Sequence, residues 1–460
     1  MLITRLARPT SVTLRAWPLA VVFFCLYGLL SIANHLAFDT TGYDLGIFEQ
    51  IVRSYAQFKV PVSELRGPGF VMLGDHFHPI LVTLAPLYWF FPSPITLLLA
   101  QAALLAVSVV PVTRTAMRLV SPKMGLVIGV AYGLSWGLQT TVDFDFHEVV
   151  FAVPLMAFAI ERLIRQEWTA AVCWAAPLIL VKEDLPLTFA ALGGYLVLKG
   201  QRRLGGWVAV AGVVSFLVIL KILIPAMNPD GEYAFTGNLG QDFSVWDLPG
   251  RLVSPDQKLF LLAAVFAPTA FLAVFSPVSL LAVPTLLWRM VSENPSHWST
   301  GFHYGAVLMP IVYLALADTL GNRGLVLPAR IRHVVVVICA VTSLAGITAM
   351  PLKKVADPAV WQPDPRLATG KRLMEAIPDN ATVAATNNLA PQLTDRTTVQ
   401  LFPHSTTRRT TDAEWVMADT FLSGWPASPE DTAKELRQLR DRNYQLVEEA
   451  DGFVLLHRTP

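Results

Sequence analysis

Three polar residues that can do chemistry, Asp75, His76 and His78, stand together in the segment GDHFHPI. They directly precede the apolar run LVTLAPLYWFF, although polar groups are unfavourable in hydrocarbon. Carboxylate and imidazole groups bind divalent cations and transfer protons. The segment is therefore a candidate metal site or catalytic cluster, and a solvated cap of the apolar run is the structural alternative.

Two further acids occur in TTGYDLGIFEQ, directly after the first long apolar run. Asp44 and Glu49 are expected near the membrane surface, where a partly dehydrated carboxylate can act as a general base. Asp44 also has the position of an N-cap for the helical pattern LGIFEQIVRSYA. The two interpretations are compatible.

A third cluster is the turn DFDFHE, which supplies Asp143, Asp145, His147 and Glu148. Alternation places the first three side chains on one side of an extended turn. Together with Asp75, His76 and His78 they would suit a divalent cation. Acids at a helix start also act as caps and dipole partners. Both interpretations stay open.

The segment LILVKEDLPLTF has three charges, Lys182, Glu183 and Asp184, between apolar residues. Charges at membrane depth are usually buried together beside a cavity. In that case Lys182 is a phosphate partner and one of the acids is its counter-ion. The alternative is a tight turn that leaves all three in headgroup water.

The segment from WRMV to GFHY contains Arg289, His303 and Tyr304. An arginine near the lipid interface beside histidines suits the phosphate of a lipid head group. Snorkelling of Arg289 and an interfacial aromatic belt that includes Tyr304 are the alternatives.

The elements that must position these residues are membrane helices. The chain has 460 residues, of which 53% are hydrophobic and only 15% charged, which excludes an ordinary soluble protein.

The run at 80–91 is short and is expected to be re-entrant or interfacial. About eleven crossings remain. They are 17–37, 94–118, 124–141, 149–164, 168–181, 185–198, 205–224, 258–275, 277–291, 304–320 and 333–350.

The charges predict how these spans are oriented. With this number of spans, every basic cluster falls on the side of the N-terminus, which the positive-inside rule makes cytoplasmic. The candidate residues then all lie in loops on the extracytoplasmic face. We expect a multi-pass protein of the plasma membrane with a cytoplasmic N-terminus.

The composition becomes polar after residue 350. A helical pattern at 430–442 and two strands joined at Asp451-Gly452 predict a small α/β domain over 351–460, after the membrane domain 1–350. An odd number of spans places this domain outside the cytoplasm. No basic aromatic surface indicates nucleic-acid binding.

The order of the motifs YDLGIFEQ, GDHFHPILVTL, FDFHE, LVKEDLPL and FHY resembles the bacterial membrane family catalogued as domain of unknown function 2079. That family is in turn similar, more distantly, to the GT-C superfamily of membrane glycosyltransferases. The resemblance implies a helix bundle with an outward-facing site that takes a sugar from a polyprenyl-phosphate carrier. It assigns Asp44 as the base or metal ligand. Paired acids are common at that position, and Glu49 or Asp75 would have to be the second acid here.

The leading hypothesis is therefore a glycosyltransferase that acts on a cell-envelope glycan or glycolipid, within the lipid membrane. Asp44, Glu49, Asp75 and His76 are its candidate catalytic residues, and the cofactor is unknown, with a divalent metal ion as one option. The other candidates are assigned to substrate binding. They are His78, His147, Glu148, Lys182, Glu183, Asp184, Arg289, His303 and Tyr304.

Two other hypotheses stay open. Charges at membrane depth suit a transporter or flippase of a lipid-linked or polar solute equally well, and a non-catalytic assembly factor is the third. Convergence of Asp44, His147 and Lys182 on one cavity favours an enzyme, whereas a path lined through the bundle favours transport.

Overall fold

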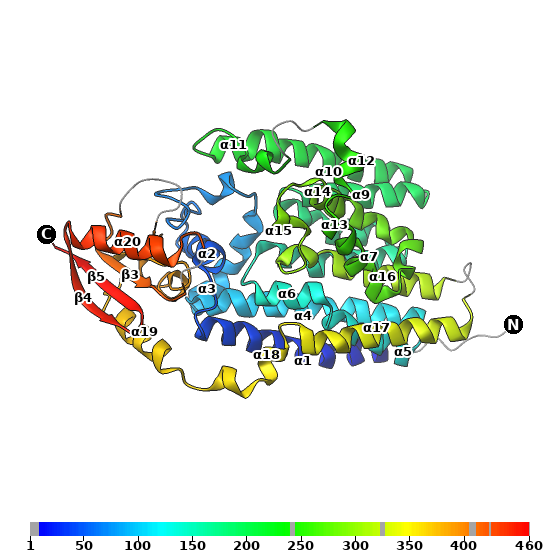
Figure 1. The fold of residues 1–460 in the computed structure, drawn as a ribbon. Helices are drawn as coiled ribbons and strands as arrows, with labels where there is room; N and C mark the ends of the chain where they lie inside the picture. Colours follow the sequence, from blue (N-terminus) through cyan, green and yellow to red (C-terminus); the bar gives the residue numbers. More distant parts are fainter. Residues whose placement is uncertain (1–8, 240–243, 323–326, 404–410, 423–424, 460) are drawn as a thin grey trace.

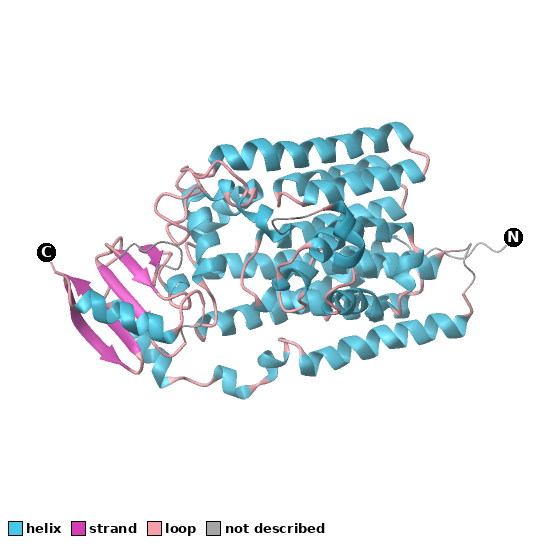
Figure 2. Cartoon of the chain, turned by 45° about the horizontal axis from the view of Figure 1, so that its top comes forward, coloured by secondary structure: helices cyan, strands magenta, loops and turns pink. Residues whose placement is uncertain are grey.

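The chain folds into an elongated helical bundle with a small sheet at one end (Figure 1). The computed structural model describes residues 9–239, 244–322, 327–403, 411–422 and 425–459. The first helix starts at the end of the bundle opposite the sheet, and the strands are confined to the C-terminal part of the chain (Figure 2). The predicted fold class, a helix bundle with a small C-terminal α/β domain, is confirmed.

The helices follow the apolar runs of the sequence. Up to residue 227 they are α1 (Pro9–Leu36), α2 (Ile47–Ala56), α3 (Ala85–Phe90), α4 (Pro94–Leu119), α5 (Pro122–Gly133), α6 (Trp136–Asp143), α7 (Ala152–Ile164), α8 (Trp168–Ala175), α9 (Leu185–Leu198), α10 (Arg202–Val218) and α11 (Ile224–Met227). The later ones are α12 (Leu248–Arg251), α13 (Gln257–Phe266), α14 (Val283–Val291), α15 (Pro295–Trp298), α16 (Leu308–Gly321), α17 (Ala329–Ala349), α18 (Lys353–Ala356), α19 (Pro365–Glu375) and α20 (Pro429–Arg440).

Within the described ranges, five helical segments are long and apolar enough to cross a membrane. They are Ala16–Leu36, Pro94–Leu119, Arg202–Met227, His303–Gly321 and Ala329–Ala349. Several other predicted spans are interrupted. The run 124–141 is divided between α5 and α6 by Ser135, whose backbone is extended. The run 258–275 breaks at Ala270 and Phe271, which both have positive φ.

The run expected to be interfacial forms a 3-10 turn over Pro79–Leu84 followed by the short helix α3. At a rise of about 1.5–2 Å per residue it is far shorter than the ~30 Å hydrocarbon core. Phe90 and Phe91 on its outer side are largely exposed. Both features favour a position in the membrane interface.

The sheet has the order β2-β1-β3-β5-β4. Its strands are β1 (Thr382–Ala385), β2 (Thr398–Leu401), β3 (Trp415–Asp419), β4 (Tyr444–Ala450) and β5 (Phe453–Arg458). The first three are parallel, while β5 is antiparallel to β3 and to β4. Asp451 and Gly452 both have positive φ between β4 and β5, as the predicted hairpin requires.

The C-terminal domain (α19 to β5, residues 365–458) is attached to the first long loop of the bundle. The Arg53 guanidinium donates to the carbonyls of Thr394 and Thr397, at 2.8 and 2.9 Å. The Gln50 amide donates to the carbonyl of Val399 at 2.9 Å. Because α2 carries both side chains, it joins the sheet to the segment that contains Asp44.

Candidate active site

Asp44 lies in a π-helical turn, Gly42–Gly46, between α1 and α2. His147 Nε2 lies 3.0 Å from one carboxylate oxygen, and the Thr41 hydroxyl donates to the other at 3.0 Å. The Asp44 side chain keeps 24% of its exposure, whereas that of His147 keeps only 6%. Asp44 is therefore a held but accessible carboxylate, which is what a general base requires.

A second acid, Asp145, lies on the other side of Thr41. Its Oδ2 accepts the Thr41 amide at 2.8 Å and lies 3.0 Å from the Thr41 hydroxyl oxygen. Asp145 is buried, and burial together with the nearby Asp44 raises the pKa of its carboxyl well above the usual range. The structure thus pairs Asp44 with Asp145 from the DFDFHE turn, in place of the expected Glu49 or Asp75.

Two stacked histidines connect Asp44 with the interior. The rings of His147 and His303 lie 3.7 Å apart and are nearly parallel. His303 is buried, and neither of its ring nitrogens has a hydrogen-bond partner in the described part of the chain. Unpaired polar atoms in a buried site are rare and indicate a place where a ligand or water binds.

His303 lines a narrow cavity, in which the centre of a water-sized molecule has about 20 Å³ of free space. Lys182 and Tyr304 are also in its wall. The remaining lining residues are Val149, Asp184, Leu185, Thr285, Trp288 and Val307. His303 is part of the cavity wall and stacks on His147, and His147 in turn contacts Asp44. The histidine pair therefore connects Asp44 with the cavity.

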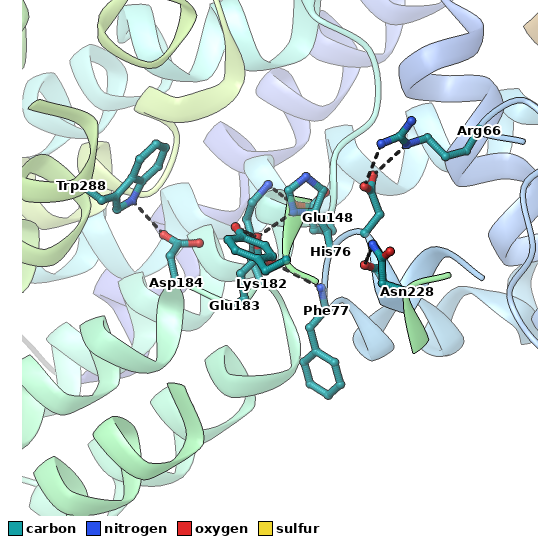
Figure 3. A network of polar contacts seen from close by, with 12 residues as sticks. Arg66, His76, Phe77, Glu148, Lys182, Glu183, Asp184, Asn228 and Trp288 are labelled. Carbon is teal, nitrogen blue, oxygen red and sulfur yellow. Dashed lines mark hydrogen bonds and ion pairs between the residues drawn. The ribbon is translucent and has the colours of Figure 1, made fainter. Parts of the chain in front are cut away.

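Lys182 is the cation of this cavity. Its ammonium lies 2.6 Å from Glu148 Oε1, in the network drawn in Figure 3. Burial disfavours the charged ammonium, yet the carboxylates of Glu148 and Glu183 raise the pKa of Lys182 above its ordinary value. Burial alone would raise the pKa of Glu148, but Lys182 and the nearby histidines lower it to about 2. The two groups form a partly buried ion pair, in which Glu148 is the buried member.

The two acids that follow Lys182 have separate partners (Figure 3). Glu183 lies 2.7 Å from His76 Nδ1 and accepts the amide of Phe77 at 3.2 Å. Burial opposes the charge of His76, but Glu183 raises the pKa of its imidazole. Asp184 accepts the indole N–H of Trp288 at 3.0 Å, and burial raises its pKa to about 6. Glu183 therefore binds the GDHFHPI segment, whereas its neighbour Asp184 binds Trp288 of α14.

Arg289 is fully buried and does not snorkel. Its guanidinium donates to three backbone carbonyls of the following loop, those of His297, Ser299 and Tyr304, at 2.6, 3.0 and 3.2 Å. Among the described residues no carboxylate forms an ion pair with it. The geometry makes Arg289 the support of the loop that presents His303, and its expected role in phosphate binding stays a prediction.

The other expected site residues lie outside this cavity wall. Asp75 pairs with Arg66 at 3.2 Å, and the buried His78 packs against the ring of Phe48. Glu49 is buried on α2 and accepts the hydroxyl of Tyr88. Over the described ranges the structure contains no group of three or more His, Cys, Asp or Glu side chains arranged to hold a metal ion.

The sequence matches the family described as Predicted membrane protein (DUF2079) over residues 34–455. The chain belongs to this family. The comparison with curated proteins gives no significant match.

Two solved structures share the fold of this DUF2079 protein. ArnT from Cupriavidus metallidurans bound to undecaprenyl phosphate superposes with a TM-score of 0.56 at 13% identity, covering 95% of this chain and 97% of that one. ArnT in the apo state gives a TM-score of 0.55 at 13% identity, covering 91% and 93%. The GT-C-like architecture that the motif order implied is confirmed at the level of the fold.

One site residue of the DUF2079 protein has neighbours that its pattern does not indicate. The alternation of Asp145 with Asp143 and His147 indicates a metal ligand, with a helix cap or dipole partner as the alternative, and neither interpretation predicts its place beside Thr41 and Asp44. Its φ of 69° is the signal that the sequence does not show. A left-handed residue redirects the chain, so the strict alternation that we expected over this turn does not hold.

Proposed function

We propose that this protein is a membrane glycosyltransferase that moves a sugar from a polyprenyl-phosphate carrier to an acceptor of the cell envelope. The observation that carries the proposal is the continuous contact from Asp44 through His147 and His303 to the Lys182 cavity. An accessible carboxylate and a partly buried cation, joined by a pair of histidines, suit a reaction in which a base and an anion-stabilising group act on the same substrate.

In this proposal Asp44 takes the proton of the acceptor hydroxyl. The acceptor oxygen then forms a bond to the anomeric carbon of the sugar, and the bond from that carbon to the phosphate oxygen breaks. The carrier leaves as polyprenyl phosphate. Lys182 has three N–H donors, of which Glu148 takes one, so donors remain for the departing phosphate. His303 has unpaired ring nitrogens in the same wall.

The carrier class is supported by the fold and by the ligand of its structural neighbour. The matched ArnT structure contains undecaprenyl phosphate. We place the site on the outer face of the plasma membrane, with the N-terminus in the cytoplasm and residues 351–460 outside as a domain separate from 1–350. The opposite ends at which α1 starts and the sheet lies support this arrangement (Figure 1).

Convergence of the candidate residues supports an enzyme over a transporter or flippase. Asp44 and His147 are in direct contact, and Lys182 lies in the cavity beside the histidine stack. Residues that line a path through the bundle would instead be spread along it.

A binding experiment tests the site. Purified full-length protein in lipid nanodiscs is titrated with undecaprenyl phosphate and followed by native mass spectrometry. We expect Lys182→Met to weaken binding about tenfold or more, because a charge-assisted hydrogen bond to phosphate is lost. Lys182→Arg should retain most of the affinity.

The controls separate phosphate binding from loss of the ion pair. Glu148→Gln removes the carboxylate and keeps the cation, so it should bind undecaprenyl phosphate at least as well as the wild type. The double variant Lys182→Met/Glu148→Gln leaves no unpaired buried charge and should still bind weakly. If the double variant binds like the wild type, Lys182 does not contact the phosphate.

A cellular experiment tests the reaction. Mass spectrometry of polyprenyl-linked sugars and envelope glycans is compared between cells with the protein, cells without it, and cells with Asp44→Asn. We expect one lipid-linked sugar to accumulate in the second and third cases. An unchanged lipid and glycan profile in cells without the protein would contradict the proposed transfer.

A further inference from the structure

The turn that carries Asp44 is held from two sides. On the side of the bundle, Thr41 and Asp44 bind Asp145 and His147. On the other side, the C-terminal domain provides the contacts, although more than 300 residues separate the partners. The loop after β1 makes the hydrogen bonds from this domain to the turn.

Asn387 in this loop makes two hydrogen bonds to the turn. Its backbone carbonyl accepts the amide of Gly42 at 2.6 Å, and its side-chain Oδ1 accepts the amide of Tyr43 at 3.0 Å. Gly42 and Tyr43 directly precede Asp44 in the same π-helical turn. A π-helical turn uses wider spacing of its own hydrogen bonds than an α-helix, and such turns are rare and gather at functional sites.

The contact is close-packed as well as hydrogen-bonded. A Cβ atom added to Gly42 would lie 2.7 Å from the Cβ of Ala390. The ring of Tyr43 packs edge-on against Trp425 of the C-terminal domain, with ring centres 4.9 Å apart. The backbone on the N-terminal side of Asp44 therefore has little freedom to shift while the C-terminal domain is in place.

We propose that Asn387 is a positioning residue for Asp44, so that the C-terminal domain completes the active site. This inference rests on the proposed function, in which Asp44 is the base. Because proton transfer requires the base within hydrogen-bond reach of the acceptor, a small displacement of the turn lowers the rate strongly. Asn387 acts through the backbone and does not touch the reacting atoms.

The neighbouring residue Asn388 provides a matched control. In the described part of the chain its side chain bonds within the C-terminal domain, where it accepts the Thr386 hydroxyl at 3.0 Å and donates to Asp419 at 2.9 Å. Asn388→Ala therefore weakens the domain without removing a contact to the turn. Asn387→Ala removes the bond to Tyr43 and leaves the interior of the domain intact.

The first measurement is hydrogen exchange of the full chain in nanodiscs, read over the peptide that contains residues 42–46. We expect the Tyr43 amide to exchange about tenfold faster or more in Asn387→Ala, because its hydrogen-bond acceptor is gone. Asn387→Asp keeps an acceptor oxygen at the same place and should restore most of the protection. Asn388→Ala should leave this peptide unchanged but lower the Tm of the protein.

The second measurement is the accumulation of the lipid-linked sugar in cells. We expect accumulation with Asn387→Ala and not with Asn388→Ala. Unchanged exchange over 42–46 in Asn387→Ala would overturn the inference, as would equal accumulation in both variants. A normal lipid profile with Asp44→Asn would instead overturn the proposed function, whatever the exchange data show.

Discussion

At the scale of single residues, the hydroxyl of Thr41 lies between the carboxyl groups of Asp44 and Asp145, and its single hydrogen limits the protonation of the pair. The Thr41 hydroxyl has one hydrogen but lies 3.0 Å from a carboxyl oxygen of both Asp44 and Asp145. One of the two carboxyl groups must therefore hold a proton if both contacts are hydrogen bonds. Burial and the neighbouring charge favour the neutral form of Asp145. Asp44 is then the partner that accepts the hydrogen of the Thr41 hydroxyl.

This assignment predicts that an Asp→Asn substitution has a small effect on activity at position 145 and a large one at position 44. Asp145→Asn replaces a neutral acid with a neutral amide, and Asn also tolerates the left-handed backbone of this position. We expect Asp145→Asn to keep activity within about threefold of the wild type, whereas Asp44→Asn should lower it about a hundredfold or more, as expected for a lost general base. Lipid-linked sugar levels in cells provide the readout. Equal losses in the two variants would show that both carboxylates are needed in ionised form.

At the scale of elements, Arg289 connects α14 to the loop that presents His303. Three carbonyls of residues 297–304 share one buried guanidinium. Arg289→Met would leave all three without that donor, and each unsatisfied buried group is unfavourable. The loop is therefore expected to lose its shape before the bundle does.

We expect Arg289→Met to lower the free energy of unfolding by about 3 kcal/mol and to expose residues 292–304 to proteolysis. Arg289→Lys should restore part of the protection, since an ammonium can still donate to the carbonyls. The control is Arg251→Met, which removes the more exposed pair with Glu293 near the same loop. Comparable proteolysis in both methionine variants would argue against a special role for Arg289.

At the scale of the whole molecule, a buried acid lies where α2 meets the C-terminal domain. Burial raises the pKa of Glu49 from 4.5 to about 7. The folded protein therefore holds a proton that the unfolded chain releases above about pH 4.5. Stability should fall as the pH rises from about 4.5 to 7 and level off above that, because both states are then deprotonated.

Glu49→Gln keeps an oxygen that can accept the Tyr88 hydroxyl but cannot ionise. We expect this variant to have a higher Tm than the wild type at pH 8 and a similar Tm at pH 4.5. The gain is at most about 3 kcal/mol, from the size of the pKa shift. Glu64→Gln, in the same loop, removes a surface carboxylate while its oxygen can still accept the Gly69 amide, and it serves as control. A parallel pH dependence in the wild type and Glu49→Gln would contradict the expectation.

Much of the architecture follows from local properties of the chain. Long apolar runs need helices in a membrane, because backbone groups there must pair within their own segment. The short run 80–91 and the Asp451-Gly452 hairpin could be predicted for the same reason, since length and turn chemistry are local. The order of the motifs was enough to predict the family. It also placed Asp44, His147 and Lys182 among the candidates for one site.

The helical class, the small C-terminal sheet, the family and the set of polar loops can thus be read from the chain alone. The contacts between distant residues come from the folded structure: Asp44 and Asp145 on either side of Thr41, Arg289 with backbone carbonyls, and the Asp44 turn with Asn387. The difference is the distance along the chain over which each signal acts. Hydropathy and turn signals act over a few neighbouring residues, whereas the partner of a buried polar group depends on how distant segments pack.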